Sequence, residues 1–159
     1  MKTLWHAAAM VAVGLALSGQ GRPQNDNHLG GLIHHYADAP ATDPWHLSGQ
    51  WSAWLQGDSG KADFTASISM VKSNSATRQP HTHHITITGG HVTSIPNGIR
   101  IAGMASVTGN GAFSFEDALT VDITGGPAVT YSNIMITFSS TAGLNHFGAA
   151  PLRGVVSSE

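Results

Sequence analysis

The 159-residue sequence contains no cysteine, which excludes disulfide bonds, thiolate metal sites and a cysteine nucleophile. Charged residues make up only 10% of the chain, and just 7 residues are Lys or Arg. Proteins bind nucleic acids largely by replacing counterions on many phosphates, which takes more basic side chains than this. We therefore expect no nucleic-acid partner. The abundant residues are glycine, with 19 copies, and histidine, with 10.

The first 18 residues have the pattern of a secretory signal peptide. Met1-Lys2 is a short positive segment, residues 4–17 are mostly apolar, and Ser18 ends a small-residue cleavage pattern. The apolar run is too short to span the roughly 30 Å of a bilayer core. We expect a secreted or periplasmic protein with no membrane span after cleavage. The predicted division is a signal peptide (1–18), an irregular N-terminal arm (19–47) and a folded domain (48–159).

The folded domain shows the period-two hydrophobic pattern of β-strands. Apolar and polar residues alternate, and Gly, Asn and Asp pairs separate the runs, as in Gly89-Gly90. About eight strands are predicted, near 48–56, 62–73, 81–88, 91–95, 99–108, 117–124, 128–138 and 151–156. Evenly spaced short strands with tight turns predict an all-β protein, built as a single antiparallel β-barrel or a β-sandwich.

Two short sites resemble the calycin β-barrels, the group that contains lipocalins and avidins. Gly49-Gln50-Trp51 opens the first predicted strand, and Arg153 lies in the last. In calycins a Gly-x-Trp on the first strand packs near a basic residue from the last strand. The resemblance implies an eight-stranded barrel in which Trp51 and Arg153 pack together at one end.

The histidines give the sharpest functional signal. In residues 81–88, HTHHITIT, the alternation that buries Ile85 and Ile87 also turns His81 and His83 inward and His84 outward. Two inward imidazoles two residues apart project in parallel and can converge on one ion. Buried without partners, each would cost about 1–3 kcal/mol, so a metal, a carboxylate, water or a ligand must satisfy them.

A third ligand would have to come from another segment. His146 is the first candidate, and the secondary candidates are His34, His35 and His46. An all-imidazole site favours Zn or Cu, because harder metals prefer carboxylate oxygens. Metal binding is expected to fade as the pH falls through about 6, because only neutral imidazole coordinates.

Three classes of function remain open from the sequence. The first is an exported barrel with a Zn or Cu site. The second is a small-ligand-binding barrel without metal, in which Phe64, Ile68 and Met70 line an apolar cavity. The third is an enzyme, such as an isomerase, cyclase or hydrolase, that uses His81 or His83 as a general acid or base at the barrel mouth. The expected partner is a small molecule or a metal ion, and the sequence does not indicate an oligomeric state.

Overall fold

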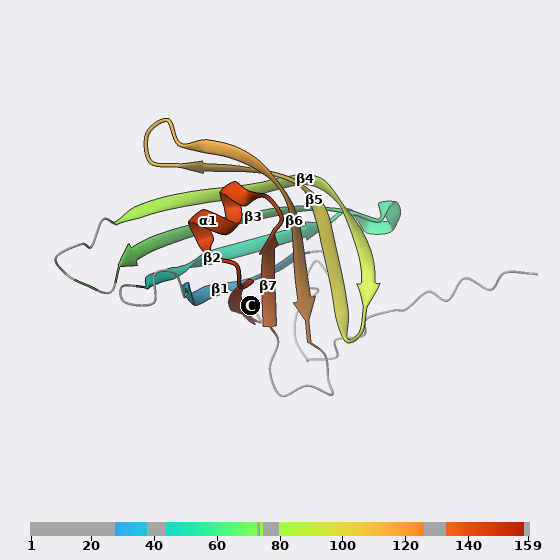
Figure 1. Ribbon diagram of the computed structural model, residues 1–159. Helices are drawn as coiled ribbons and strands as arrows, with labels where there is room; N and C mark the ends of the chain where they lie inside the picture. The colour runs from blue at the N-terminus through green and yellow to red at the C-terminus, as the bar shows by residue number, and fades with distance from the viewer. Residues whose placement is uncertain (1–27, 38–43, 73, 75–79, 126–132, 158–159) are drawn as a thin grey trace, which may run out of the picture.

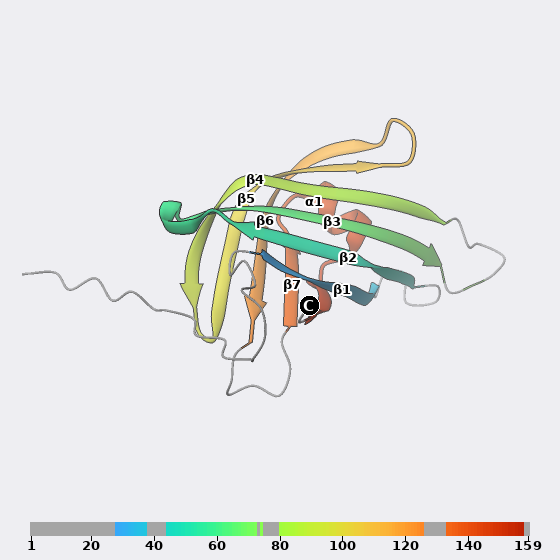
Figure 2. The same ribbon diagram turned by 180° about the vertical axis from the view of Figure 1, so that it is seen from behind.

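The structure is a computed structural model that describes residues 28–37, 44–72, 74, 80–125 and 133–157. Eight antiparallel strands form a closed barrel in which each strand pairs with the next along the chain and the last strand pairs with the first (Figures 1 and 2). The predicted all-β antiparallel barrel is therefore confirmed, and the chain is not a sandwich. The signal peptide predicted over residues 1–18 lies outside the described residues. The strands are β1 (His28–Ala37), β2 (Trp45–Leu55), β3 (Lys61–Lys72), β4 (His81–Ile95), β5 (Gly98–Gly109), β6 (Ser114–Thr124), β7 (Asn133–Phe138) and β8 (Leu152–Ser157), with a 3-10 turn η1 (Gly57–Ser59) and one helix α1 (Thr141–Phe147).

Two predictions about the strands are wrong, and they offset each other in the strand count. Residues 28–37, assigned to an irregular arm, form β1, which closes the barrel between β2 and β8. The two strands predicted at 81–88 and 91–95 are one strand, β4. Gly89 has a positive φ of 63° and donates its backbone N–H to Asp63 Oδ1 at 2.7 Å. The glycine pair therefore bends one strand at a register shift instead of reversing the chain.

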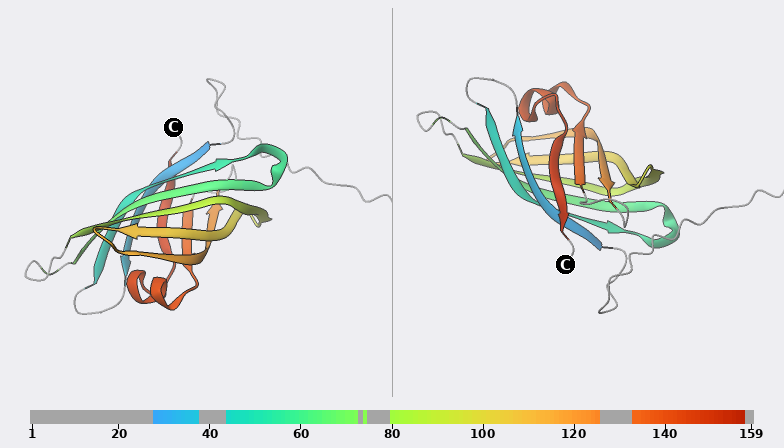
Figure 3. Two further views of the ribbon diagram at one scale, coloured as in Figure 1. Left: turned by 90° about the horizontal axis from the view of Figure 1, so that it is seen from above. Right: turned by 90° about the horizontal axis from the view of Figure 1, so that it is seen from below.

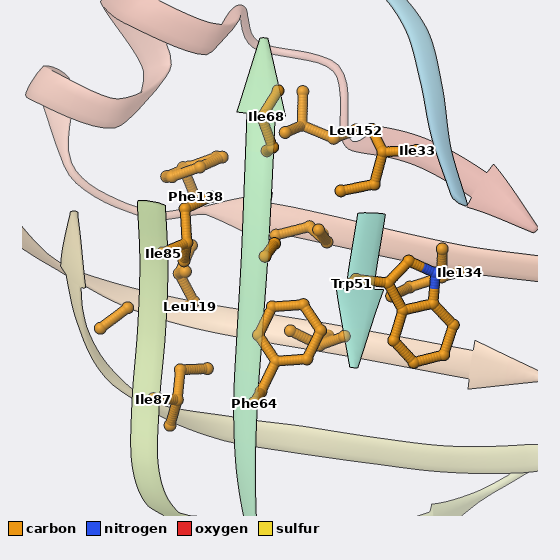
Figure 4. Close-up of a cluster of buried hydrophobic side chains, with 14 of the residues drawn as sticks. Ile33, Trp51, Phe64, Ile68, Ile85, Ile87, Leu119, Ile134, Phe138 and Leu152 are labelled. Atoms are coloured by element: carbon orange, nitrogen blue, oxygen red, sulfur yellow. The ribbon is translucent and has the colours of Figure 1, made fainter. Parts of the chain in front are cut away.

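The barrel interior is packed with apolar side chains, as expected for eight strands. Residues on alternate positions of every strand point inward, and Figure 4 shows isoleucine, leucine, phenylalanine and tryptophan side chains from several strands meeting there. Phe64, Ile68 and Met70 have no exposed surface, so no water-sized space lies beside them. Within the part of the chain that the structure describes, the apolar ligand cavity predicted around these three residues is therefore not seen.

Trp51 contacts the last strand, but not through Arg153. Its indole Nε1 donates a hydrogen bond to the Val155 carbonyl oxygen at 3.1 Å, and its ring stacks on Phe64. The indole passes beside Gly31 of β1, where a Cβ would overlap the Val155 carbonyl. Arg153 is exposed, because its position in β8 alternates with that of buried Leu152. The packing predicted between Trp51 and Arg153 is therefore not found.

One end of the barrel carries the helix, and we call it the α1 end. Because successive strands run in opposite directions, the start of β4, the end of β5 and the start of β6 all lie there, together with α1 between β7 and β8 (Figures 1 and 3). Within the described part of the chain, no helix has the length and apolar character needed to cross a membrane. The α1 end brings the first residues of β4 close to the helix.

Candidate metal centre

The first two residues of the site come from the start of β4. His83 is 2% exposed and lies between Ile68 of β3 and Gly109 of β5. His81, one alternation nearer the barrel end, is partly buried, and their ring centroids are 4.9 Å apart. His84 is exposed. The period-two prediction of which histidines turn inward is confirmed on β4.

His146 meets these two rings from α1. Its Nε2 lies 2.7 Å from His83 Nε2, and its ring centroid lies 5.5 Å from that of His81. One ligand atom from each of His81, His83 and His146 lies within 4.8 Å of the others. The structure thus brings together the three residues named as first candidates, and we call them the histidine triad.

The helix that carries His146 begins and ends at identifiable residues. The Ser140 side chain accepts a hydrogen bond from the Gly143 N–H at 3.1 Å, which caps the first turn. The chain leaves the helix at Gly148, with a positive φ of 95° and its N–H bonded to the Leu144 carbonyl. Phe147 is fully buried and stacks on Phe138 at 4.4 Å between centroids. The buried ring of Phe147 therefore packs the last turn of α1 against the barrel, with His146 beside it.

The hydrogen bonds of His83 define its protonation. Its Nδ1 lies 3.2 Å from the Thr108 carbonyl oxygen, which can only accept a hydrogen bond. Nδ1 therefore carries the proton, and the lone pair of Nε2 faces His146, which donates from its own Nε2. A metal-binding histidine commonly has this arrangement, with one nitrogen free for the ion and the other donating to a backbone carbonyl.

Aromatic rings surround the triad. Phe113 and Phe147 each lie about 5 Å from both the His83 and His146 rings, at centroid distances of 4.9 to 5.2 Å. Trp45 contacts His81 edge-on at 4.9 Å, with Lys72 Nζ 5.2 Å above the indole. Gly109 leaves space for His83, because a Cβ there would lie 2.9 Å from the imidazole. These apolar walls reduce the hydration of the imidazoles.

Burial and mutual repulsion keep the inner rings neutral. The pKa of His83 is lowered from 6.5 to about 4, first by loss of hydration and then by the nearby His146 and His81 rings. The pKa of His146 is lowered as well, mainly by burial and then by His81. At neutral pH both rings are uncharged, which is the state that binds a metal ion.

The lowered pKa of His83 predicts acid sensitivity of the metal-free protein. Between pH 6.5 and about 4, His83 is protonated in the unfolded chain but not in the folded protein. The free energy of unfolding should therefore fall as the pH drops through this range. The full pKa difference corresponds to about 3 kcal/mol, which solvent screening at the barrel end reduces to about 1–2 kcal/mol. Urea unfolding at pH 7, 5 and 4 should show this loss in the parent and less of it in a His83→Gln variant. An identical pH dependence in both proteins would contradict the prediction.

The geometry of the triad suits a tetrahedral ion after a small opening. Two imidazole nitrogens bound to tetrahedral zinc at roughly 2.0–2.1 Å lie about 3.3 Å apart. The 2.7 Å between the Nε2 atoms of His83 and His146 must therefore lengthen by about 0.6 Å as an ion replaces the shared proton. His146 must then carry its one proton on Nδ1 instead of Nε2, so that Nε2 is free to bind the ion. Three imidazoles would leave a fourth coordination position open.

The secondary candidates lie apart from the triad. His35 is buried inside the barrel but comes from β1, three strands from β4, and does not belong to the group within 4.8 Å. His34 and His46 lie on outward positions of β1 and β2, where their ring centroids are 4.9 Å apart and Tyr36 stacks on His46. Strand alternation therefore excludes His34 and His46 from the interior site.

Asp117 is the main residue of this region that the sequence analysis missed. It lies on β6, is 1% exposed, and accepts hydrogen bonds from the segment that leads into α1. The available signal was its position: Asp117 falls on the inward-facing alternation of Leu119 and Val121. A carboxylate at an interior position of a strand needs specific partners.

Comparison with protein-family models, with curated proteins and with solved structures finds no match to this chain. The resemblance to calycins is therefore not established beyond the eight-stranded barrel itself. The feature of the described residues that points to a function is the histidine triad.

Proposed function

We propose that this barrel binds one Zn²⁺ or Cu²⁺ ion through the histidine triad at the α1 end. The observation that carries the proposal is the convergence, within 4.8 Å, of ligand atoms from two residues of one strand and one residue of a helix that begins 58 positions after His83. Two inward histidines on one strand could occur by chance, but this does not explain why α1 places the His146 ring against them. The hydrogen bond from His83 Nδ1 to the Thr108 carbonyl supports the same reading.

The ligand set limits the metals. Neutral imidazoles suit Zn²⁺ and Cu²⁺, whereas Mg²⁺ and Ca²⁺ require oxygen ligands. The inward carboxylate of Asp117 is engaged by three donors from Ser139 and Ser140 and takes no part in the group of ligand atoms. The open fourth position would hold water or a small ligand, as it does in three-histidine zinc sites that activate water.

General acid–base catalysis is a second candidate for the same residues. The observation that favours it is the direct hydrogen bond between the His146 and His83 rings, which can pass a proton from one to the other. Metal content separates the two functions. The protein, purified without an affinity tag, is expected to contain or take up one equivalent of Zn²⁺ or Cu²⁺, measured by elemental analysis and calorimetric titration. Failure to retain either ion after reconstitution at pH 7 would favour acid–base chemistry.

We also propose that the protein is exported to the periplasm or secreted. The support is the sequence of residues 1–18, with its positive start and apolar run. The intact mass of the exported protein is expected to correspond to a chain that begins near residue 19. A soluble cytoplasmic product that retains residues 1–18 would contradict this.

A further inference from the structure

Asp117 is a buried carboxyl residue whose hydrogen-bond partners, among the residues that the structure describes, lie in one short segment. Its Oδ1 accepts hydrogen bonds from the backbone N–H groups of Ser139 at 3.0 Å and Ser140 at 2.9 Å, and its Oδ2 accepts one from Ser140 Oγ at 2.6 Å. Burying a carboxylate is costly unless strong hydrogen bonds compensate. The three bonds therefore define one position for the chain between β7 and α1.

The same contacts continue into the helix. Ser140 Oγ, held by Asp117, accepts the N–H of Gly143 and so caps the first turn of α1. Gly143 packs so closely on β6 that a Cβ would overlap the Asp117 carboxylate. Within the seven residues of α1, this anchored turn is followed directly by the turn that carries His146. The first turn of α1 is therefore anchored to Asp117, immediately before the turn that carries His146.

We propose that Asp117 is the positioning residue for the third ligand of the histidine triad, acting through Ser140 and the first turn of α1. This proposal rests on the proposed metal-binding function. His81 and His83 are fixed by the hydrogen-bonded strand β4, whereas His146 is held by a seven-residue helix with one buried aromatic anchor, Phe147. Metal–ligand distances vary by only about 0.2 Å, so coordination by His146 should weaken when the first turn of α1 loses its anchor.

The test compares Zn²⁺ affinity in three single variants. Ser140→Ala and Asp117→Ala are expected to lower the affinity about 10- to 100-fold, as loss of supporting groups around metal ligands commonly does, and Asp117→Asn less, because its side-chain oxygen still accepts the two backbone bonds. The matched control is Asp63→Ala. Asp63 also accepts a backbone N–H, from Gly89, and a side-chain N–H, from Gln56, but it lies away from the triad, so its loss should leave Zn²⁺ affinity unchanged.

A double variant distinguishes positioning from a general loss of stability. If Asp117 acts only through His146, the Ser140→Ala/His146→Ala protein should bind Zn²⁺ as weakly as His146→Ala alone. Additive losses of affinity in the double variant would overturn the proposal. Ser140→Ala keeps the carboxylate and two of its bonds, so this arm remains informative if Asp117→Ala does not fold.

A metal-free measurement separates failure of this proposal from failure of the metal site. Imidazole ¹⁵N spectra of the apoprotein should show the His146 Nε2–H···Nε2 His83 hydrogen bond in the parent and in Asp63→Ala, and its loss in Ser140→Ala. If the parent binds no Zn²⁺ but the hydrogen bond depends on Ser140, the metal function is wrong and the positioning role stands. If the hydrogen bond persists in Ser140→Ala, the positioning role is wrong.

Discussion

Replacing His83 with alanine is expected to abolish stoichiometric Zn²⁺ binding, with a loss of affinity of at least about 1,000-fold. His83 is the most deeply buried member of the triad, at 2% exposed, and its ring lies nearest to the other two, with centroids 4.9 Å from His81 and 4.6 Å from His146. His81→Ala should also abolish stoichiometric binding, because two imidazoles leave the ion with half of a tetrahedral ligand set. Calorimetric titration at pH 7 with a competing chelator measures both losses.

The control for this prediction is the neighbouring residue. His84→Ala removes an imidazole from the same strand, but from an exposed position on the outer face, and should leave Zn²⁺ affinity within about twofold of the parent.

Because the pKa values of His83 and His146 are lowered, protons should compete with Zn²⁺ for these two ligands only at a pH below the ordinary imidazole pKa of about 6.5. Equal Zn²⁺ affinity in the His81→Ala/His83→Ala double variant and the parent would remove the triad as a metal site.

The sequence correctly predicts the directions of His81 and His83 because both follow from the hydrophobic alternation of one strand. A one-residue slip of β4 would bury His84 and expose Ile85 and Ile87, which are both fully buried. That exchange costs several kcal/mol at about 1.5–3 kcal/mol per side chain. The inward direction of His81 and His83 therefore follows from hydrophobic alternation alone.

No hydrophobic periodicity in the sequence predicts the helix that completes the site. A seven-residue helix has too few turns to show a hydrophobic stripe, and its stability comes from tertiary contacts, namely Phe147 on Phe138 and Ser140 on Asp117. The local signals were a Ser that can cap a helix and a Gly that can end one, at Ser140 and Gly148. Each is common in loops, so His146 could be named as a ligand but not placed.

The sequence does not predict β1 because the barrel needs small residues at inward positions of this strand, whereas a recognisable strand pattern needs large apolar residues there. Its inward positions are Gly31, Ile33, His35 and Ala37, with only one large aliphatic side chain. Gly31 has no side chain because the Trp51 indole and the Val155 carbonyl occupy that space. The hydrophobic volume that β1 lacks is supplied by β2, and no single-segment pattern can show this exchange.

Removing β1 is expected to prevent the barrel from folding. A chain shortened to residues 44–159 should not fold, whereas residues 27–159 should fold like the parent. Without β1, β2 and β8 both become open edges, which favour aggregation, and the indole of Trp51 loses the strand beside it. The loss is on the order of the 5–15 kcal/mol that stabilises a typical domain. Circular dichroism, amide NMR dispersion and size-exclusion chromatography would show the difference.

Two neighbouring residues test the same point without truncation. Ile33 points into the core and is 2% exposed, whereas Leu32, adjacent to it on β1, is 58% exposed. Ile33→Ala should lower the free energy of unfolding by about 2–4 kcal/mol, because it leaves a cavity in the barrel. Leu32→Ala should change it by less than about 0.5 kcal/mol. If residues 28–37 formed an irregular arm, the two substitutions would have similar small effects. Equal changes in the free energy of unfolding, measured in urea, would therefore contradict the assignment of β1 to the barrel. A large difference is expected if β1 is a strand with one inward and one outward face.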